Sequence, residues 1–404
     1  MPTPPPFDYD TVYSHKVRVG IPRTPQTPVP YDFAVGHPDA STFPSQALGE
    51  ATTRMLLREG RELALYPGDM SHDAARHLVS RKLQAHEGVD IPPSRIIITN
   101  GSMQGLLMVA EAFINPGDTV IVEEFSYPGT LRAFGYCEPR YATVPTDEEG
   151  IIVAELARAL DRLAARGVTP KLVYTIANFQ NPTGSVMSLP RRRALMQLAE
   201  ERRLLVIEDD AYGDLVYEGE PVTSLYALSR TDNVVRLGTF SKIVAAGVRL
   251  GWVIAPEPVL ARLAVTKIDG GTSAFTSRAV AEYLQDHLDA RMATLLGVYR
   301  SKRDAMLEAL EEHLSGVATW SRPRGGLFIW VRLPEGYNTT TLLEAAHASG
   351  VAYLPGTNFS PEGKGASYLR LSFAYLSPET IRAGIALLAR VVKAARPLKA
   401  TALA

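Results

Sequence analysis

Cysteine is nearly absent from this sequence, which has one thiol, Cys137, in 404 residues. A single thiol excludes an internal disulfide and any zinc site built from several cysteines. The eight histidines show neither the HxxxH nor the HExxH spacing of a metal-binding helix, so we expect no metal. Because cysteine-poor chains of this kind suit a reducing compartment, we expect a cytoplasmic protein.

An excess of charge of either sign is also missing, since 42 lysine and arginine residues balance 43 aspartate and glutamate residues. This balance argues against binding to nucleic acid or to a membrane surface, which a basic stripe would indicate. No run approaches the ~18 apolar residues of a transmembrane helix. The start, MPTPPPFDYD, has neither the basic beginning nor the apolar stretch of a secretory signal. The 46% of hydrophobic residues indicates an ordinary soluble protein, long enough for two or three domains.

Regular periodicity is absent from the first 45 residues, which are rich in proline. The stretch IPRTPQTPVPY (21–31) excludes a regular helix, because each proline removes a donor and restricts the residue before it. We expect an extended arm, 1–45, that lies on the body of the protein, with a disordered tail over about the first ten residues. The remainder is divided into a large domain, 46–285, and a small domain, 286–404.

From about residue 50 the sequence alternates short apolar runs with helical patterns such as GLLMVAEAF (105–113). Several runs are apolar on both faces, which is typical of a parallel sheet covered on both sides. The alternation predicts an α/β domain with a mostly parallel sheet of seven strands. The last two runs are too close for a helical crossover, so one of them is expected to run antiparallel. The runs are 95–100, 118–124, 140–145, 171–176, 203–210, 233–240 and 249–255.

The remaining sequence predicts a second, smaller domain. Apolar positions at helical spacing indicate one long helix over about 273–314. A shorter α+β pattern follows it. Its elements are apolar runs at 325–333, 351–356 and 368–374, a helix near 340–348 and a last helix from Ser377 to about Ala395.

Polar residues gather directly after the predicted strands, where open α/β sheets bind ligands. Asp209 and Asp210 end one strand, and either they form a metal pair or one of them holds a buried cation. Lys242, in GTFSKIVAAGVRLGW (238–252), has a plain interpretation as an exposed lysine. In a walled cleft beside Arg249, its pKa would instead fall from about 10.4, and its amine would become a nucleophile for carbonyls.

An aldehyde cofactor that carries a phosphate would use each of these groups. Lys242 would form a Schiff base, Asp209 would keep a ring nitrogen protonated, and Tyr127 would cover one face of the ring. The phosphate would lie against Gly101–Gln104, Ser241 and Arg249, because a strand followed by an apolar helix leaves free amides at the helix start.

Several motifs occur together in the order and spacing of a known family, and they cover about residue 30 to the end. From these motifs the sequence resembles the fold type I pyridoxal 5'-phosphate (PLP) enzymes of aminotransferase class I/II. Within that family it is most similar to the 2-aminoadipate and kynurenine aminotransferase branch. The motifs are VGHPDASTFP, ITNGSMQG, GDTVIVEEFSYPGT, NFQNPTG, EDDAYGDL, TFSKIVAAGVRLGW, RPRGGLFIWVRLP and YLRLSFA.

The resemblance implies a role for each site residue. Lys242 is the Schiff-base lysine that also moves protons, Asp209 pairs with the pyridine nitrogen, and Tyr127 stacks on the ring. The phenolic oxygen of the cofactor is bound by Asn181 and Tyr212. The residues implied at the phosphate are Ser102, Met103, Gln104, Thr239, Ser241 and Arg249.

The substrate side follows from the same resemblance. Arg370 matches the arginine that binds the α-carboxylate of the substrate with two parallel hydrogen bonds. Gly36, Asn181 and Arg23 are expected near the substrate, although a plain solvated arginine is the alternative interpretation of Arg23. Tyr66 resembles the tyrosine that reaches the phosphate of the neighbouring subunit, which implies a homodimer with shared active sites.

Three functions fit these features. The first is an aminotransferase of amino-acid metabolism or biosynthesis, which moves the amino group of an L-α-amino acid to a 2-oxo acid. The second is a relative that uses the same site for elimination, cyclisation, or oxygen-dependent oxidation or decarboxylation. The third is an effector-sensing module like the aminotransferase-like half of some transcription regulators, although no helix-turn-helix segment is expected in the proline-rich start. Departures from the family pattern at Val35, Ser71 and Ala75 all lie on the substrate side.

Overall fold

The computed structural model of the protein describes residues 7–18, 28–68 and 72–395. Its centre is a sheet of seven strands in the order β2-β10-β9-β8-β7-β3-β4. All seven predicted strands are confirmed, as is the type I fold with its mostly parallel sheet. The strands are β2 (Ile96–Thr99), β3 (Thr119–Glu123), β4 (Arg140–Val144), β7 (Leu172–Thr175), β8 (Leu205–Asp210), β9 (Val234–Thr239) and β10 (Gly251–Ile254).

One strand of this sheet, β10, runs against its neighbours. It pairs antiparallel with both β2 and β9, whereas the other pairings in the sheet are parallel. The predicted antiparallel strand is therefore confirmed. Because β10 is reversed, its first residues lie at the same edge of the sheet as the last residues of the parallel strands.

Helices cover both faces of the large sheet and bury its alternating side chains. Leu106, Phe134 and Leu263 pack on one face with β-strand residues such as Val122. The other face is covered through residues such as Leu156. The helices are α4 (Ser102–Phe113), α5 (Pro128–Gly135) and α9 (Glu257–Thr266) on the first face, and α6 (Val153–Ala165), α7 (Leu189–Glu201) and α8 (Leu225–Leu228) on the second.

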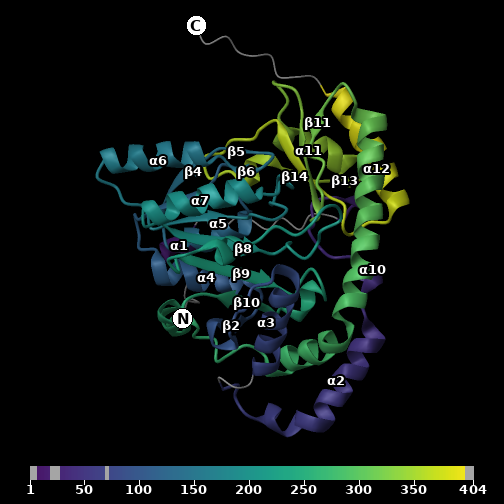
Figure 1. The fold of residues 1–404 in the computed structure, drawn as a ribbon. Coiled ribbons are helices and arrows are strands. Elements are labelled where there is room, and N and C mark those ends of the chain that lie inside the picture. Colours follow the sequence, from purple (N-terminus) through teal and green to yellow (C-terminus); the bar gives the residue numbers. More distant parts are fainter. Residues whose placement is uncertain (1–6, 19–27, 69–71, 396–404) are drawn as a thin grey trace, which may run out of the picture.

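The long helix predicted near 273–314 is confirmed as α10 (Ala274–Leu314), which has 41 residues. Figure 1 shows it in green, running along one side of the molecule past both sheets. At its start it packs with α2 (Ser45–Glu59) and α3 (Asp73–Glu87), and farther along with α12 (Pro378–Ala394). Among the described helices, none combines the length and the apolar character needed to cross a membrane.

The smaller sheet has four antiparallel strands in the order β11-β12-β15-β14. The predicted α+β pattern is confirmed here, and Ser377 caps the last helix by accepting from the amide of Thr380. Its elements are β11 (Thr319–Trp320), β12 (Phe328–Arg332), α11 (Thr339–Ala348), β13 (Val351–Ala352), β14 (Leu354–Pro355), β15 (Tyr368–Ser372) and α12.

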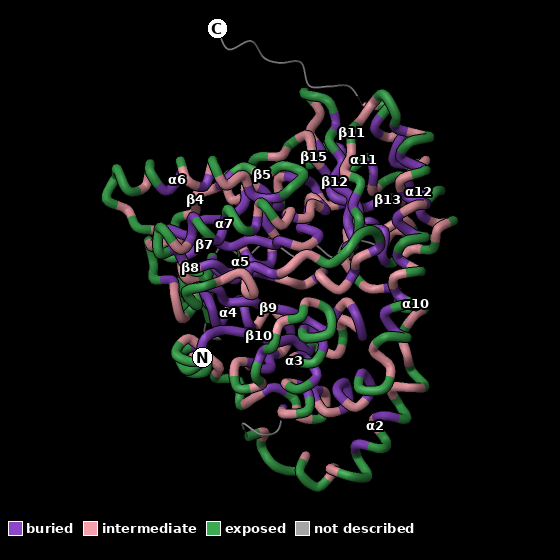
Figure 2. The backbone as a smooth tube through the Cα atoms, in the orientation of Figure 1, coloured by how far each residue is buried: buried purple, intermediate pink, exposed green. Residues whose placement is uncertain are grey.

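The N-terminal arm departs from a purely extended chain. Part of it does lie on the body, since β1 (Tyr31–Asp32) pairs parallel with β13. However, α1 (His15–Arg18) is a short helical turn, and His15 bonds Glu138 at 2.7 Å. Most of the proline-rich stretch 21–31 lies outside the described residues, as do residues 1–6 of the tail expected over about the first ten; Tyr9–Thr11 form a short 3-10 helix. In Figure 2 the exposed segments concentrate on the outer helices, with α2 projecting from the body and the buried residues in the central strands.

Candidate active site

The predicted site residues converge at one edge of the large sheet. Parallel strands place the residues that follow their carboxyl ends side by side. Arg249 joins them from the opposite direction, because it stands two residues before the reversed strand β10. The other residues at this edge are Ser102 after β2, Tyr127 after β3, Asn181 after β7, Asp209 in β8, and Ser241 and Lys242 after β9.

Lys242 lies in a turn after β9, and its side chain is half-buried. The Nζ atom donates to the backbone oxygen of Gly36 at 2.8 Å and lies 5.9 Å from the centre of the Tyr212 ring. Burial, followed by the charges of Arg370 and Arg249, lowers the pKa of Lys242 to about 8. About a tenth of the amine is therefore neutral at pH 7, far more than for an ordinary lysine, and the neutral form is the one that acts as a nucleophile or proton acceptor.

Asp209 has two carboxylate oxygens in different situations. Its Oδ2 atom accepts a hydrogen bond of 2.8 Å from the hydroxyl of Tyr174, which in turn accepts one of 2.8 Å from Thr130. Its Oδ1 atom is buried and has no hydrogen-bond partner. Burial raises the pKa of Asp209 to about 6. A buried oxygen without a donor suits a ligand that brings its own N–H.

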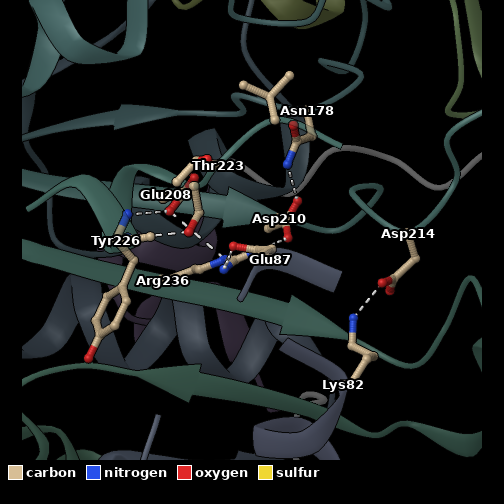
Figure 3. Close-up of polar contacts among 12 residues, drawn as sticks. Lys82, Glu87, Asn178, Glu208, Asp210, Asp214, Thr223, Tyr226 and Arg236 are labelled. Atoms are coloured by element: carbon tan, nitrogen blue, oxygen red, sulfur yellow. Dashed lines mark hydrogen bonds and ion pairs between the residues drawn. The ribbon is translucent and has the colours of Figure 1, made fainter. Parts of the chain in front are cut away.

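The neighbouring Asp210 does not join Asp209, because successive residues of a strand point to opposite faces of the sheet. The metal-pair interpretation of these two residues is therefore wrong. On the back face Asp210 meets Arg236, whose Nη2 atom donates to Asp210 Oδ2 at 2.5 Å. Figure 3 shows Arg236 held among the carboxylates of Glu87, Glu208 and Asp210, and we call these four residues the back-face cluster.

An anion site forms where β2 meets the start of α4. Gly101 has a φ of +76°, which favours glycine, and its missing side chain leaves room for Nη2 of Arg249, which lies 2.5 Å from where a Cβ would stand. Arg249 donates to the backbone oxygens of Ala246 and Asn100 at 3.1 and 3.3 Å. The amides at the start of α4, including that of Ser102, lie beside this cation and suit a phosphate.

The other residues implied at the phosphate differ in how far they are engaged. The hydroxyl of Thr239 donates to Ser241 at 2.9 Å, which places both beside the Lys242 turn. Gln104 is tied to the start of its own helix, since its amide donates to Asp269 at 2.5 Å and accepts from the Asn100 N–H at 2.8 Å. The side chain of Met103 contacts the position of Gly129.

Arg370, in β15, closes the cleft from the small sheet. It is buried, and its Nη1 atom donates to Asn181 Oδ1 at 3.0 Å, while Nη2 donates to the backbone oxygen of Ala34. Its guanidinium carbon lies 4.1 Å from the centre of the Phe328 ring. The Nε atom is buried without a partner, and burial lowers the pKa of Arg370 to about 10. No carboxylate of the described residues forms an ion pair with this cation, so an incoming carboxylate would be favoured.

Asn181 and Tyr212 extend the polar contacts of this arginine toward the lysine. Asn181 donates from Nδ2 to the hydroxyl of Tyr212 at 3.5 Å. Burial raises the pKa values of Tyr212 and Tyr127. Both phenols therefore stay neutral across the physiological range, and each can donate or accept.

One predicted residue stands apart from the others. Tyr66 is 94% exposed in the single chain. Arg23 lies outside the described residues, as does Ser71. The structure brings together the other predicted residues, from Gly36 to Arg370.

Sequence reasoning missed Tyr174, which donates to Asp209, and Thr130, which donates to Tyr174. Tyr174 and Thr130 are fully buried, and no role was assigned to either, although Thr130 ends the motif GDTVIVEEFSYPGT. One signal was available for Tyr174, because a tyrosine inside an otherwise apolar strand must find a partner for its hydroxyl. The alternation of β7 then places that hydroxyl on the face of Asp209.

The comparisons with known proteins agree with this geometry. Residues 30–388 match the family model for aminotransferase class I and II. The chain is 38% identical over 365 residues to aromatic-amino-acid aminotransferase 1 of Thermococcus litoralis, covering 89% of this chain and 87% of the relative.

Two solved structures are also similar. The multiple substrate aminotransferase of Thermococcus profundus is 34% identical with a TM-score of 0.91, covering 96% of this chain and 98% of that one. The α-aminoadipate aminotransferase of Thermus thermophilus, complexed with N-(5'-phosphopyridoxyl)-L-leucine, is 35% identical with a TM-score of 0.84, covering 90% and 92%. The expected branch is thereby confirmed, and the chain belongs to the aminotransferase class I and II family.

Proposed function

We propose that this protein is a PLP-dependent aminotransferase that moves the amino group of an L-α-amino acid to a 2-oxo acid. The observation that carries the proposal is the buried Oδ1 atom of Asp209, which lacks a hydrogen-bond donor and lies in the same group of residues as Lys242 and Arg370. The pyridine N–H of PLP is a donor of the required kind. A phosphopyridoxyl-amino acid in the similar Thermus thermophilus structure supports the same occupant.

The residues would divide the work by position. PLP, when bound, supplies an aldehyde that takes up the amino group and a ring that withdraws electrons from the α-carbon. Asp209 would hold the proton on the ring nitrogen, and Asn181 and Tyr212 would bind the phenolic oxygen. The start of α4 and Arg249 would hold the phosphate. Tyr127 would cover the ring and exclude water from one face.

Lys242 and Arg370 would act on the substrate. The neutral amine of Lys242 would accept the proton of the α-carbon. It would then donate that proton to the former aldehyde carbon of the cofactor, which carries the amino group. Arg370 would bind the α-carboxylate through two parallel hydrogen bonds, which fix the direction of the α-carbon bond that breaks. Transamination is favoured over elimination, cyclisation or oxidation because the similar proteins named above are aminotransferases.

Cofactor binding tests the first half of the proposal. Incubation with PLP should give a yellow protein, and borohydride reduction followed by peptide mapping should place the label on Lys242. Lys82 and Lys302 are matched controls, because both are buried but each is paired with a carboxylate at 2.5 Å. A label on either control, or a protein that stays colourless, contradicts the assignment.

The reaction tests the second half. The loaded protein should convert L-amino acids to more than one equivalent of 2-oxo acid per site only when a 2-oxo acid acceptor is present, with products identified by mass. Each reactive amino acid should be compared with its decarboxylated amine, which lacks the group that Arg370 would bind. Product beyond one equivalent per site without an acceptor would favour the elimination or oxidation alternative, and equal reaction of the amine would remove the role of Arg370.

We also propose a homodimer with shared sites. Tyr66 is 94% exposed, and in the same stretch Leu57 and Leu65 are 85% and 71% exposed. Clustered apolar side chains on one surface are typical of an interface. If Tyr66 completes the site of a partner, mixing Lys242→Ala with Tyr66→Ala should restore activity, because one site of each heterodimer is intact. A fully active monomer would contradict the sharing.

A further inference from the structure

One face of α10 grips the chain segment that contains Gly36. Tyr299 accepts from the backbone N–H of Asp39 at 3.2 Å. One turn farther along, Lys302 donates to Asp39 Oδ2 at 2.5 Å and to the backbone oxygen of Ala374 at 3.0 Å. Both helix residues are buried. The segment is thus attached to the helix just after the carbonyl that Lys242 touches.

Arg291 lies on the same face of α10, two turns before Tyr299, and it reaches the lysine turn itself. Its Nε and Nη2 atoms donate to the backbone oxygens of Ile243 and Val244 at 2.9 and 3.2 Å. Its Nη1 atom donates to the backbone oxygen of Thr42. Arg291 is 6% exposed, and none of the ion pairs among the described residues includes it.

The lysine turn needs such a partner. The amides of Ile243 and Val244 bond the Phe240 oxygen at 3.3 and 2.9 Å, so residues 240–244 form a single helical turn that does not continue. The carbonyls at the end of such a turn lack amide partners from a following helix turn. The planar fork of an arginine can bind several carbonyls at once, which the point charge of a lysine cannot.

We propose that Arg291 is a positioning residue for Lys242. By binding the carbonyls that follow Lys242 and the carbonyl of Thr42 together, it sets the lysine turn against the segment whose Gly36 oxygen receives the Nζ atom at 2.8 Å. The helix therefore fixes both ends of that contact. The importance of the contact for turnover rests on the proposed function, but the positioning itself does not.

The test measures Lys242 in the cofactor-free protein. Trace acetylation at a series of pH values, followed by peptide mapping, gives the midpoint of Lys242, and amide hydrogen exchange reports the turn. In Arg291→Gln the freed turn should expose the amine to water. Its midpoint should rise from about pH 8 by about one unit, so that labelling at pH 8 falls about fivefold. Amide exchange over residues 243–246 should increase.

Arg303→Gln is the matched control, because Arg303 is equally buried on the same helix but donates to Pro323 and Glu218 instead of the lysine turn. It should leave both readouts unchanged even if the melting temperature falls. Arg291→Lys keeps the charge and most of the stem, and it should behave like Arg291→Gln. A folded Arg291→Lys or Arg291→Gln protein with the wild-type labelling profile and exchange would overturn the proposal. If the Arg291 variants shift the profile but the wild-type protein proves inactive in transamination, the result contradicts the proposed function alone.

Discussion

Asp209 and Asp210 are neighbours on β8, yet they face opposite sides of the sheet and meet opposite surroundings. On the cleft face, Asp209 has one oxygen bonded to Tyr174 and one without a partner. On the back face, Asp210 accepts from Arg236 and, at 2.9 Å, from Asn178. Burial raises the pKa of Asp209 to about 6. Burial acts the same way on Asp210, but Arg236 and Asn178 outweigh it, so its pKa lies below the ordinary value.

The difference separates a site for a ligand from a structural contact. In the back-face cluster each carboxylate has its counter-charge within the chain, and Glu208 also accepts from the amides of Leu225 and Tyr226 at 2.9 and 3.0 Å. The cleft face leaves Asp209 Oδ1 and Arg370 Nε with neither a hydrogen bond nor an ion pair, whereas Arg236 Nε, which also lacks a hydrogen bond, lies 3.9 Å from Glu208 Oε2. Unpaired buried polar atoms cost stability, and they persist where a bound molecule completes them.

The largest expected effect concerns the back-face cluster. Arg236→Met should lower the free energy of unfolding by about 3–5 kcal/mol, because it leaves three buried carboxylates without their cation. Urea unfolding of the cofactor-free protein at pH 7 measures this. Arg230→Met removes an ion pair to Glu200 whose arginine is 78% exposed, and it should cost at most about 1 kcal/mol. Equal losses in the two variants would mean that burial does not distinguish the pairs.

The next effect concerns turnover. Asp209→Ala should lower kcat by about 10²–10³, the usual loss when a preorganised electrostatic contact to the reacting group is removed. Asp210→Asn should keep the wild-type kcat per folded molecule, because its side chain faces away from the cleft. Steady-state kinetics with circular dichroism as a folding check decides between them. The reverse outcome would place the ring nitrogen on the wrong carboxylate.

The pH dependence of stability should have opposite signs for the two residues. The folded pKa of Asp209, about 6, exceeds the unfolded value of 3.8, so its native state keeps a proton that the unfolded chain releases. Stability is therefore lost as the pH rises through this window, by up to about 3 kcal/mol. Asp209→Asn should remove that loss. The stability of the variant relative to wild type should therefore be higher at pH 7.5 than at pH 5.

Asp210 gives the contrasting case. Its folded pKa is depressed, so its contribution is present at neutral pH and is lost only as the pH falls through the folded value. Asp210→Asn should therefore be less stable than wild type at pH 7.5. Urea midpoints of the cofactor-free proteins at several pH values test both variants. The same sign of change for both at pH 7.5 would contradict the assignment of their environments.

The smallest expected effect sharpens the account of Asp209. Tyr174→Phe removes one hydrogen bond to the carboxylate, worth about 0.5–1.5 kcal/mol, and should raise the pKa of Asp209 further. Carbon-13 NMR of the aspartate carboxyls in the cofactor-free protein measures that shift. Tyr141→Phe is the control, since its hydroxyl donates to the backbone oxygen of Leu131 at 2.8 Å, away from Asp209. A wild-type Asp209 pKa in Tyr174→Phe would remove Tyr174 from the site.

The large sheet was predictable because each of its strands is a continuous apolar run followed by a turn signal. The reversal of β10 followed from chain length alone, since 233–240 and 249–255 leave no room for a crossover helix. The arm was less predictable, because α1 is a single turn stabilised by a distant contact of His15 with Glu138. No local pattern encodes a contact between residues 123 positions apart.

The site residues, like the elements of the fold, were predictable only in part. Residues after strand ends, such as Lys242 and Asn181, were found because sequence position fixes their place at the sheet edge. Arg291 and Tyr174 were missed because their roles depend on tertiary packing. Arg291 stands 47 and 48 positions from the carbonyls of the lysine turn, on a helix whose periodic pattern indicated only packing.

Because α10 is long, a small change in its direction moves its far end by a large distance. A helix of 41 residues is about 60 Å long, so a tilt of about 5° at one end would displace the other by about 5 Å. Arg291 lies nearer the start and Lys302 farther along, and both grip the segment at Gly36. A small rotation of the helix would therefore move Arg291 and Lys302, and the residues that they bond, by different amounts. The contact between Lys242 and the Gly36 oxygen therefore depends on how α10 lies against both segments.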